Sequence, residues 1–357
     1  MSASQHLCWL SQFRVVEGVV RLFGVSQTGV ALSRDASSLT ETLGSEPQPR
    51  AWFEQRFEPG DLAELERKGV IVPLAPPIPD TARAGTVVFE PHPDDAALSC
   101  VGAALRACRC GEVPAVITVF SSHTVADFEW QDRLSWDDAI YTAERGRERL
   151  LAAAVIGARS EALGLADARA RGRKLSPRTS TAFRAVERRI VDELAQRFTA
   201  ILDRLQPHTI LAPAAIGWHV DHRLVLAAAL EAAAVHDHAD LHLFEDYPYA
   251  ANDRADCWTR LHALSTLLPL RARHVILDEL FELRVRAAWV HRSQFPASCL
   301  RLLHLKLHEF ARATAMQARL TGLDPTCTER PVERLWCVDT GTADRSELLR
   351  RAAQTVA

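Results

Sequence analysis

The sequence of 357 residues lacks long apolar runs and a strong charge of one sign. No stretch approaches the roughly 18 consecutive apolar residues of a membrane span, so we expect none. The first residues lack a basic region followed by an apolar core, which argues against a secretory signal peptide and favours a cytoplasmic location. The formal net charge is −3, so nothing favours nucleic acid or an anionic membrane as a partner.

Closely spaced cysteine pairs are also almost absent. The eight cysteines are scattered through a long chain and do not frame a small disulfide-stapled domain, so reduced thiols are the simpler interpretation. Cys108 and Cys110 are the exception, and they fall within or just after a predicted helix. A soft-metal or redox pair at that place is the alternative interpretation.

Residues 1–80 are predicted to form a small α+β accessory domain that ends in a proline-rich linker. The pattern predicts short strands within residues 13–32 and 70–73, helices over 36–43 and 52–68 with a break at Pro59-Gly60, and the linker over 74–80. A helix, a glycine and a short strand resemble the end of the winged-helix-like modules found with enzymes that modify ribosomal peptides. A peptide or protein partner is therefore one hypothesis for this domain, and a structural cap or oligomer contact is the other.

From residue 86 onward, strands and helices alternate, which predicts a mainly parallel sheet with helices on both faces. Residues 81–357 are therefore expected to form a Rossmann-like, three-layer αβα domain. The pattern predicts strands at 87–89, 115–120, 163–165, 209–211, 241–244, 275–277 and 333–338. It predicts helices at 98–109, 143–156, 182–205, 224–230, 279–291 and 299–320, the last as one helix or two.

A cluster of possible metal ligands, Pro91-His92-Pro93-Asp94-Asp95, directly follows the first of these strands. His92 and Asp95 are three residues apart and can both point into the mouth above the strand's carboxyl end, where open α/β sheets bind ligands. Asp94 then points elsewhere and remains free for proton transfer. The alternative is that two aspartates before a helix only cap it and complement its dipole.

A second cluster, with two histidines and an aspartate, lies within residues 217–223 and also joins a strand to a helix. A catalytic zinc takes three protein ligands and keeps a fourth position for water. Such a set is formed by His92, Asp95 and His222. Acid, base and orienting roles are then left for Asp94, His219 and Asp221. A lone histidine in a loop is usually only solvated, but two such clusters together indicate a metal site.

Other polar runs have simpler interpretations. The basic residues 169–174 are typical of a solvated loop, with contact to an anionic substrate as the alternative. His236, His238 and His242 resemble a third metal cluster but fall near a helix end and a following strand. We therefore interpret them as surface polar groups.

Seven motifs follow one another along the chain: Pro91–Asp95, Arg147–Ala154, Leu163–Asp167, His219–Arg223, Glu245–Tyr249, Ser293–Phe295 and Glu333–Trp336. In this order they resemble the PIG-L/LmbE-like N-deacetylases, which are metal-dependent hydrolases of N-acetylated sugars and related amides. The resemblance covers residues 86–338.

The resemblance implies a role for each candidate residue. His92, Asp95 and His222 would bind the metal, expected to be Zn²⁺ with Fe²⁺ as the alternative. Asp94 would be the general base. His219 would either stabilise the tetrahedral intermediate or protonate the leaving amine, and Asp221 would orient it. Arg147 is similar to a family arginine near the substrate. Apart from the resemblance, the aromatic Trp130 and Tyr247 are expected to bind substrate, and Trp136 and Tyr249 are further candidates for stacking on a sugar ring. The alternative is that these aromatic side chains only pack.

The chain departs from the family pattern at two positions. The family usually has Glu after the two aspartates, where this chain has Ala96, and often has Pro where this chain has Val220. The first departure means that a contact supporting the metal ligands is missing or is supplied elsewhere.

Three functional hypotheses follow. The first is a hydrolase that removes an N-acetyl or similar N-acyl group from an amino sugar or a specialised-metabolite amine. The second is an amidase that acts on a larger amide, such as a thiol-sugar conjugate or a modified peptide. The third is an inactive binding or scaffold protein that keeps the fold, for which Ala96 would be a sign of decay.

Overall fold

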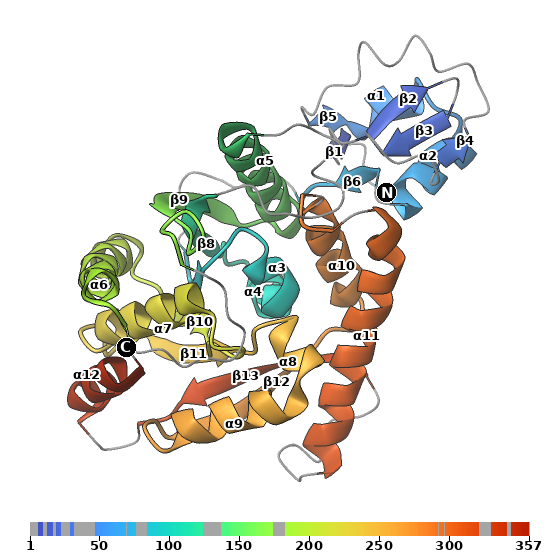
Figure 1. Cartoon of the computed structure of the whole chain (residues 1–357). Helices are drawn as coiled ribbons and strands as arrows, with labels where there is room; N and C mark the ends of the chain where they lie inside the picture. Colours follow the sequence, from blue (N-terminus) through green and yellow to red (C-terminus); the bar gives the residue numbers. More distant parts are fainter. Residues whose placement is uncertain are drawn as a thin grey trace.

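The computed structural model describes residues 6–9, 13–16, 19–22, 29–31, 47–68, 70–75, 84–123, 137–173, 183–291, 293–295, 297–320, 330–340 and 344–356. These residues form a seven-stranded sheet covered by helices and a smaller N-terminal unit, drawn in blue in Figure 1. The predicted three-layer α/β fold is confirmed.

The large sheet has the strand order β12-β13-β11-β10-β7-β8-β9. Its strands are β7 (Thr86–Glu90), β8 (Ala115–Ser122), β9 (Arg159–Ala166), β10 (Thr209–Pro213), β11 (Asp240–Phe244), β12 (Leu270–Ile276) and β13 (Val332–Val338). The five strands from β11 to β9 are parallel, whereas β13 runs antiparallel to both of its neighbours. The prediction of a mainly parallel sheet is therefore confirmed, although β9 and β12 extend beyond the predicted ranges.

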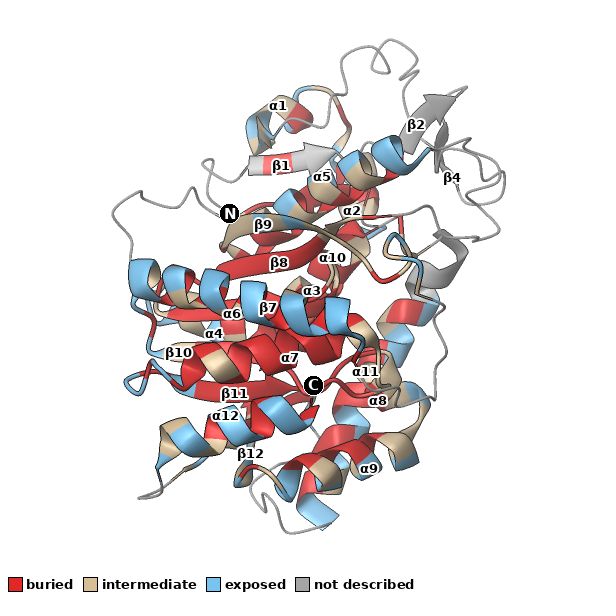
Figure 2. Cartoon of the chain, turned by 60° about the vertical axis from the view of Figure 1, so that its left-hand side comes forward, coloured by how far each residue is buried: buried red, intermediate tan, exposed pale blue. Residues whose placement is uncertain are grey.

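Side chains alternate between the two faces of β7 and form two buried cores. Val87 and Phe89 join the core with α6, α7, α9 and α12, while Val88 joins the core with α4, α5 and α10. A strand buried on both faces needs apolar residues at every position, which explains the run Val87-Val88-Phe89. Figure 2 shows β7, β8, β10 and β11 as largely buried between helices whose outer faces are exposed.

The helices agree with the sequence pattern in most places. They are α3 (Asp95–Ser99), α4 (Val101–Arg109), α5 (Asp138–Ile156), α6 (Ala185–Leu205), α7 (Val220–Ala233), α8 (Tyr249–Asn252), α9 (Arg254–Ser265), α10 (Leu280–Val290), α11 (Ala297–Leu320) and α12 (Arg345–Val356). Helices α8, α9 and α12 were not predicted. Asp253, whose side chain accepts a hydrogen bond from the Asp256 N–H, is the capping signal that marks the start of α9. Among the described residues, no helix combines the length and apolar character that a membrane crossing requires.

The N-terminal unit contains two three-stranded antiparallel sheets and two short helices. One sheet is β5-β1-β6 and the other β2-β3-β4. The elements are β1 (His6–Trp9), β2 (Phe13–Val16), β3 (Val19–Leu22), β4 (Gly29–Ala31), β5 (Gln48–Pro49), α1 (Arg50–Glu54), α2 (Pro59–Arg67) and β6 (Ile71–Pro73). The break predicted at Pro59-Gly60 is the start of α2. The predicted helix 36–43 and most of the predicted linker lie outside the described residues.

Apolar side chains join the N-terminal unit to the large sheet's helices. Leu7, Phe53 and Leu62 belong to the same buried core as Leu105 on α4 and Leu151 on α5. The division at residue 80 and a partner for this unit stay predictions.

The chain reverses its direction across the sheet between β7 and β10. From β7 it proceeds to β8 and β9 on one side, and it then returns to β10 and β11 on the other. Open α/β sheets bind ligands at such a switch point, outside the carboxyl ends of the strands. The two predicted clusters follow β7 and β10, so the fold brings them to this place.

Candidate metal centre

The turn after β7 holds the first two candidate ligands. The carboxylate oxygen Oδ2 of Asp95 accepts a hydrogen bond from the backbone N–H of His92 at 2.8 Å and lies 3.2 Å from His92 Nδ1. Asp94 occupies the N-cap position of α3, but its side chain makes no capping hydrogen bond. Capping alone therefore does not explain the two adjacent aspartates.

The loop between β10 and α7 carries the remaining cluster and has an unusual backbone. Ala215 and Trp218 have φ values of 57° and 60°, and Gly217 has a φ of 81°. A Cβ on Gly217 would lie 2.5 Å from the ring of Tyr249, so only glycine fits there. Strained loops of this kind concentrate at functional sites. This loop delivers His219 and His222 to the first turn of α7.

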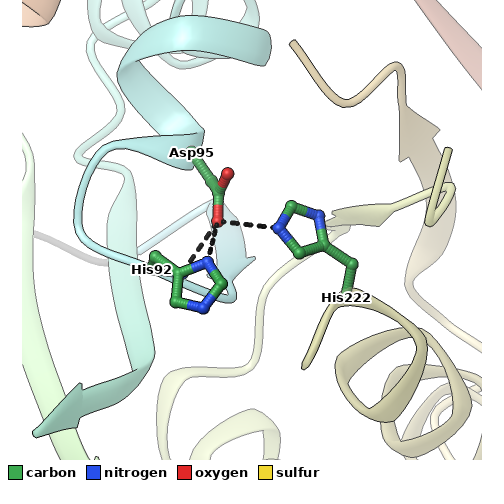
Figure 3. A group of neighbouring side chains, drawn as sticks. All are labelled: His92, Asp95 and His222. Atoms are coloured by element: carbon green, nitrogen blue, oxygen red, sulfur yellow. Dashed lines mark hydrogen bonds and ion pairs between the residues drawn. The ribbon is translucent and has the colours of Figure 1, made fainter. Parts of the chain in front are cut away.

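His92, Asp95 and His222 converge, as Figure 3 shows: an oxygen of Asp95 lies between the two imidazole rings. Asp95 Oδ2 is 3.4 Å from His222 Nε2, and the three ligand atoms lie within 4.8 Å of one another. The side chain of His92 is 16% exposed, whereas those of Asp95 and His222 are 8% and 1% exposed. The group therefore opens toward His92, and its donor set fits a divalent metal with one position left for water.

In each candidate ligand histidine, the ring nitrogen that faces away from the group contacts a buried carboxylate. His92 Nε2 lies 3.0 Å from Asp221 Oδ2, and His222 Nδ1 lies 2.5 Å from Asp246 Oδ1. Such pairs fix the ring and the tautomer of a ligand histidine, leaving its other nitrogen for the metal. We predicted that Asp221 orients His219, but only its backbone N–H contacts that ring, at Nδ1. Its carboxylate holds His92 instead.

His92, His219 and Asp221 form a second group that is close enough to bind an ion. Asp221 is fully buried, however, and its oxygens accept hydrogen bonds from Arg171 at 2.6 Å and from the Ala168 N–H at 2.9 Å. An ion would have to displace these partners, so the group containing Asp95 fits better. Arg171, within the basic run that we interpreted as solvated, is thus part of the site's support.

Charge and burial set the protonation of the cluster. Burial alone would lower the pKa of His92, but its bonds to Asp221 and Asp95 raise it to about 10. The pKa of Asp95 is held well below its usual value by His222 and His92, against the effect of burial. Burial lowers the pKa of His219 to about 3. Because His219 Nδ1 accepts the Asp221 N–H, this neutral ring carries its proton on Nε2.

Asp94 is held by Arg145, an arginine that we did not predict as a site residue; the substrate-binding role of Arg147 stays a prediction. Arg145 on α5 donates to Asp94 Oδ1 at 2.7 Å and is only 6% exposed. The side chain of Arg147 is 50% exposed and pairs with Glu144. Tyr141, Arg145 and Glu148 are the buried positions of this stretch of α5, and their helical spacing could have identified Arg145 as the arginine on the buried face.

Of the two tyrosines proposed as aromatic contacts, Tyr249 lies beside the cluster and Tyr247 does not. Tyr247 is 3% exposed and packs against Phe310, with ring centroids 5.7 Å apart, so its ring belongs to the core. Tyr249 lies edge-on to His222 instead, with a centroid distance of 5.8 Å. Trp130 and Trp136 lie outside the described residues.

His123, which follows β8, lies beside the cluster and was not predicted as a site residue. Its Nδ1 lies 3.2 Å from Asp167 Oδ2, its ring centroid is 6.4 Å from that of His92, and its Nε2 is buried without a hydrogen-bond partner. Burial lowers the pKa of His123 to about 4, so the ring is neutral. A buried imidazole beside the cluster with one unused nitrogen is suited to a substrate hydrogen bond.

The remaining cysteine and histidine candidates do not form sites. Within the described part of the chain, the only groups of three potential ligands are the two that contain His92. His236 pairs with Asp203, and His242 contacts Cys337. Both histidines are buried, so our interpretation as surface groups was wrong for them. Cys108 donates to the Ile156 carbonyl, and Cys108 and Cys110 are both free thiols.

Known proteins share this fold and parts of this sequence. The PIG-L family profile, described as GlcNAc-PI de-N-acetylase, matches residues 87–233. The 2'-N-acetylparomamine deacetylase of Streptomyces fradiae is 33% identical over 228 residues, which are 61% of this chain and 76% of that protein. A teicoplanin-pathway deacetylase complex has a TM-score of 0.54 at 22% identity, covering 71% of this chain and 96% of its own. The zinc-inhibited form of teicoplanin deacetylase has a TM-score of 0.53 at 23% identity, covering 71% and 97%.

The three-layer α/β fold of this chain is thus shared with solved deacetylase structures. The chain belongs to the PIG-L family.

Proposed function

We propose that this chain is a metal-dependent N-deacetylase that hydrolyses the acetamide of an amino sugar or of a specialised-metabolite amine. One observation carries the proposal: Asp95 lies between His92 and His222, while its neighbour Asp94 stays outside the group and is held by Arg145. This arrangement supports a ligand role for Asp95 and a proton-transfer role for Asp94. The relative that acts on 2'-N-acetylparomamine supports an amino sugar as the acyl carrier.

His92, Asp95 and His222 would hold a divalent ion, with Zn²⁺ proposed and Fe²⁺ as the alternative, and such an ion would lower the pKa of water from about 15.7 to about 7. Asp94 accepts the proton of the attacking water. The water oxygen bonds to the acetyl carbon, the C–N bond breaks, and Asp94 returns the proton to the amine. The products are acetate and the free amine.

The hydrogen bonding and burial of His219 favour one of the two roles that were left open for it. Its depressed pKa makes it a poor source of a proton, whereas its Nε2–H is available as a hydrogen-bond donor. We therefore assign it to the oxygen that gains negative charge in the tetrahedral intermediate. On the substrate side, we assign a stacking or packing contact to Tyr249 and a hydrogen bond to His123 Nε2.

The test measures metal content and acetate release on the same samples of wild type, His222→Ala and Asp94→Asn. Substrates are 2'-N-acetylparomamine and free N-acetylglucosamine, with Zn²⁺, Fe²⁺, Co²⁺ and Mn²⁺ loaded separately because zinc inhibits one structural relative. We expect one ion per wild-type chain. His222→Ala should lose both the ion and acetate release, and Asp94→Asn should keep the ion while losing roughly 10³-fold in rate.

Other outcomes would favour the rival hypotheses. A wild-type chain that binds metal and releases amine from larger amides, but no acetate from either sugar, would identify the larger-amide hydrolase. If the wild-type chain binds none of the four ions, the inactive binding protein would be the remaining hypothesis. Asp94→Asn with wild-type turnover would refute the assigned general base.

A further inference from the structure

Glu90, the last residue of β7, is a buried carboxylate that the proposed chemistry does not use. It is 1% exposed, and both of its oxygens accept hydrogen bonds. Oε2 accepts the backbone N–H of Ala96 at 3.0 Å, and Oε1 accepts the hydroxyl of Thr118 at 2.5 Å. A carboxyl group in a strand core is costly unless it is satisfied in this way. The bonds therefore tie the end of β7 to both α3 and β8.

The Glu90–Ala96 bond spans the turn that carries two of the three candidate ligands. Within it lie His92 and Asp95, which are joined by the inner bond from the His92 N–H to Asp95 Oδ2. Two nested hydrogen bonds thus fix how far apart the two ends of this turn can move. The separation of His92 Nδ1 from Asp95 Oδ2 depends on both.

A small cavity lies beside Ala96 and is lined in part by charged residues. The Ala96 side chain borders a cavity of about 10 Å³, which is room for about one water molecule. Glu90 and Arg149 line the same cavity. The Nε of Arg149 is buried without a hydrogen-bond partner, so a positive group there faces the space beside Ala96.

We propose that Glu90 is a positioning residue of the metal centre: it supplies from β7 the buried carboxyl group that the family usually carries at the position of Ala96. The Glu90 side chain reaches the Ala96 N–H and the cavity beside Ala96 from the opposite end of the turn. The buried carboxyl group is then moved from position 96 to position 90, and Ala96 is not a sign of lost activity. The inference rests on the proposed metal site but not on the identity of the substrate.

A double-mutant cycle tests the exchange, with Glu90→Ala, Ala96→Glu, the double variant and Glu90→Gln. Each chain is titrated with Zn²⁺ against a competing chelator and with Co²⁺, whose visible spectrum reports the ligand geometry. Melting temperatures of the metal-free chains and acetate release are recorded on the same samples.

We expect Glu90→Ala to weaken Zn²⁺ binding by about 10- to 100-fold and to change the Co²⁺ spectrum. Ala96→Glu alone should also weaken binding, because it places a second carboxyl group in a cavity with room for about one water. The double variant should return to within about 3-fold of wild type and restore the spectrum. Glu90→Gln, which keeps an acceptor for the Ala96 N–H, should stay close to wild type.

The proposal is overturned if Glu90→Ala binds Zn²⁺ with wild-type affinity. It is also overturned if the loss of Zn²⁺ affinity in the double variant equals the sum of the losses, in free energy, of the two single variants. If Glu90→Ala does not fold, a folded, metal-binding double variant still supports the exchange, and an unfolded one refutes it. Metal binding that follows the cycle without any acetate release would refute the proposed deacetylase activity and leave this inference standing.

Discussion

The two loops that meet at the switch point build their half of the site in different ways. The turn after β7 is short, and its ligands His92 and Asp95 are fixed mainly by bonds within the turn and to Glu90. The loop after β10 positions His222 through Asp246, which follows the next strand of the sheet. The bonds of the first half are therefore local apart from the Asp221 contact to His92, whereas His222 is held by a long-range contact.

Asp221 connects the two halves. It stands on α7, after the second loop, but its carboxylate supports His92 of the first turn and accepts from Arg171 beyond β9. The sequence pattern around each ligand therefore identifies it, whereas the orientation of the ligand histidines depends on carboxylates from other parts of the chain. Variants of these carboxylates can separate the two contributions.

The largest effect is expected from Asp221→Ala. The change leaves the Arg171 guanidinium, 13% exposed, without its buried partner and removes the support of His92. We expect a loss of about 3 kcal/mol in the free energy of unfolding and about 100-fold in metal affinity. Urea denaturation and metal titration measure the two effects. Wild-type values for both would mean that Asp221 does not connect the two loops.

A smaller effect is expected from Asp246→Asn, which weakens the bond to His222 Nδ1 while keeping an acceptor for the Ile216 N–H. Metal affinity should fall roughly 30-fold with little change in stability. Asp203→Asn is the matched control, because Asp203 pairs with His236 at an exposed position. Equal affinities for the two variants would contradict a role for Asp246.

Much of this arrangement could be predicted because its signals are local. Ligands three residues apart after an apolar strand, and a second cluster before an Ala/Leu-rich helix, place His92, Asp95 and His222 without a structure. Strand–helix alternation likewise predicts the layers. Glu90 gives no such signal, since a glutamate at a strand end is ordinarily solvated, and its role depends on the space left by Ala96.

Other contacts depend on rotation around a helix and on packing, which the sequence does not show. Positions 145 and 147 differ by about 200° around a helix, so choosing between them requires knowing which face of α5 is buried. Tyr247 and Tyr249 are equally aromatic in the sequence, and only the packing of Phe310 places the first in the core. Asp246 was visible within a motif, but its contact with His222 depends on the pairing of β10 with β11.

The smallest effect is expected from the pair Arg145→Ala and Arg147→Ala, which tests how Asp94 of the first turn is held from α5. Both changes remove an arginine from the same helix, so their effects on helix propensity match. Arg145→Ala removes the partner of Asp94 and should lower kcat for acetate release roughly 10-fold through misplacement of the base, with metal content unchanged. Arg147→Ala should stay within about 2-fold because its side chain is half exposed. If Arg147→Ala lowers kcat more than Arg145→Ala does, the substrate contact belongs to Arg147 as the sequence predicted, and Arg145 only supports the fold.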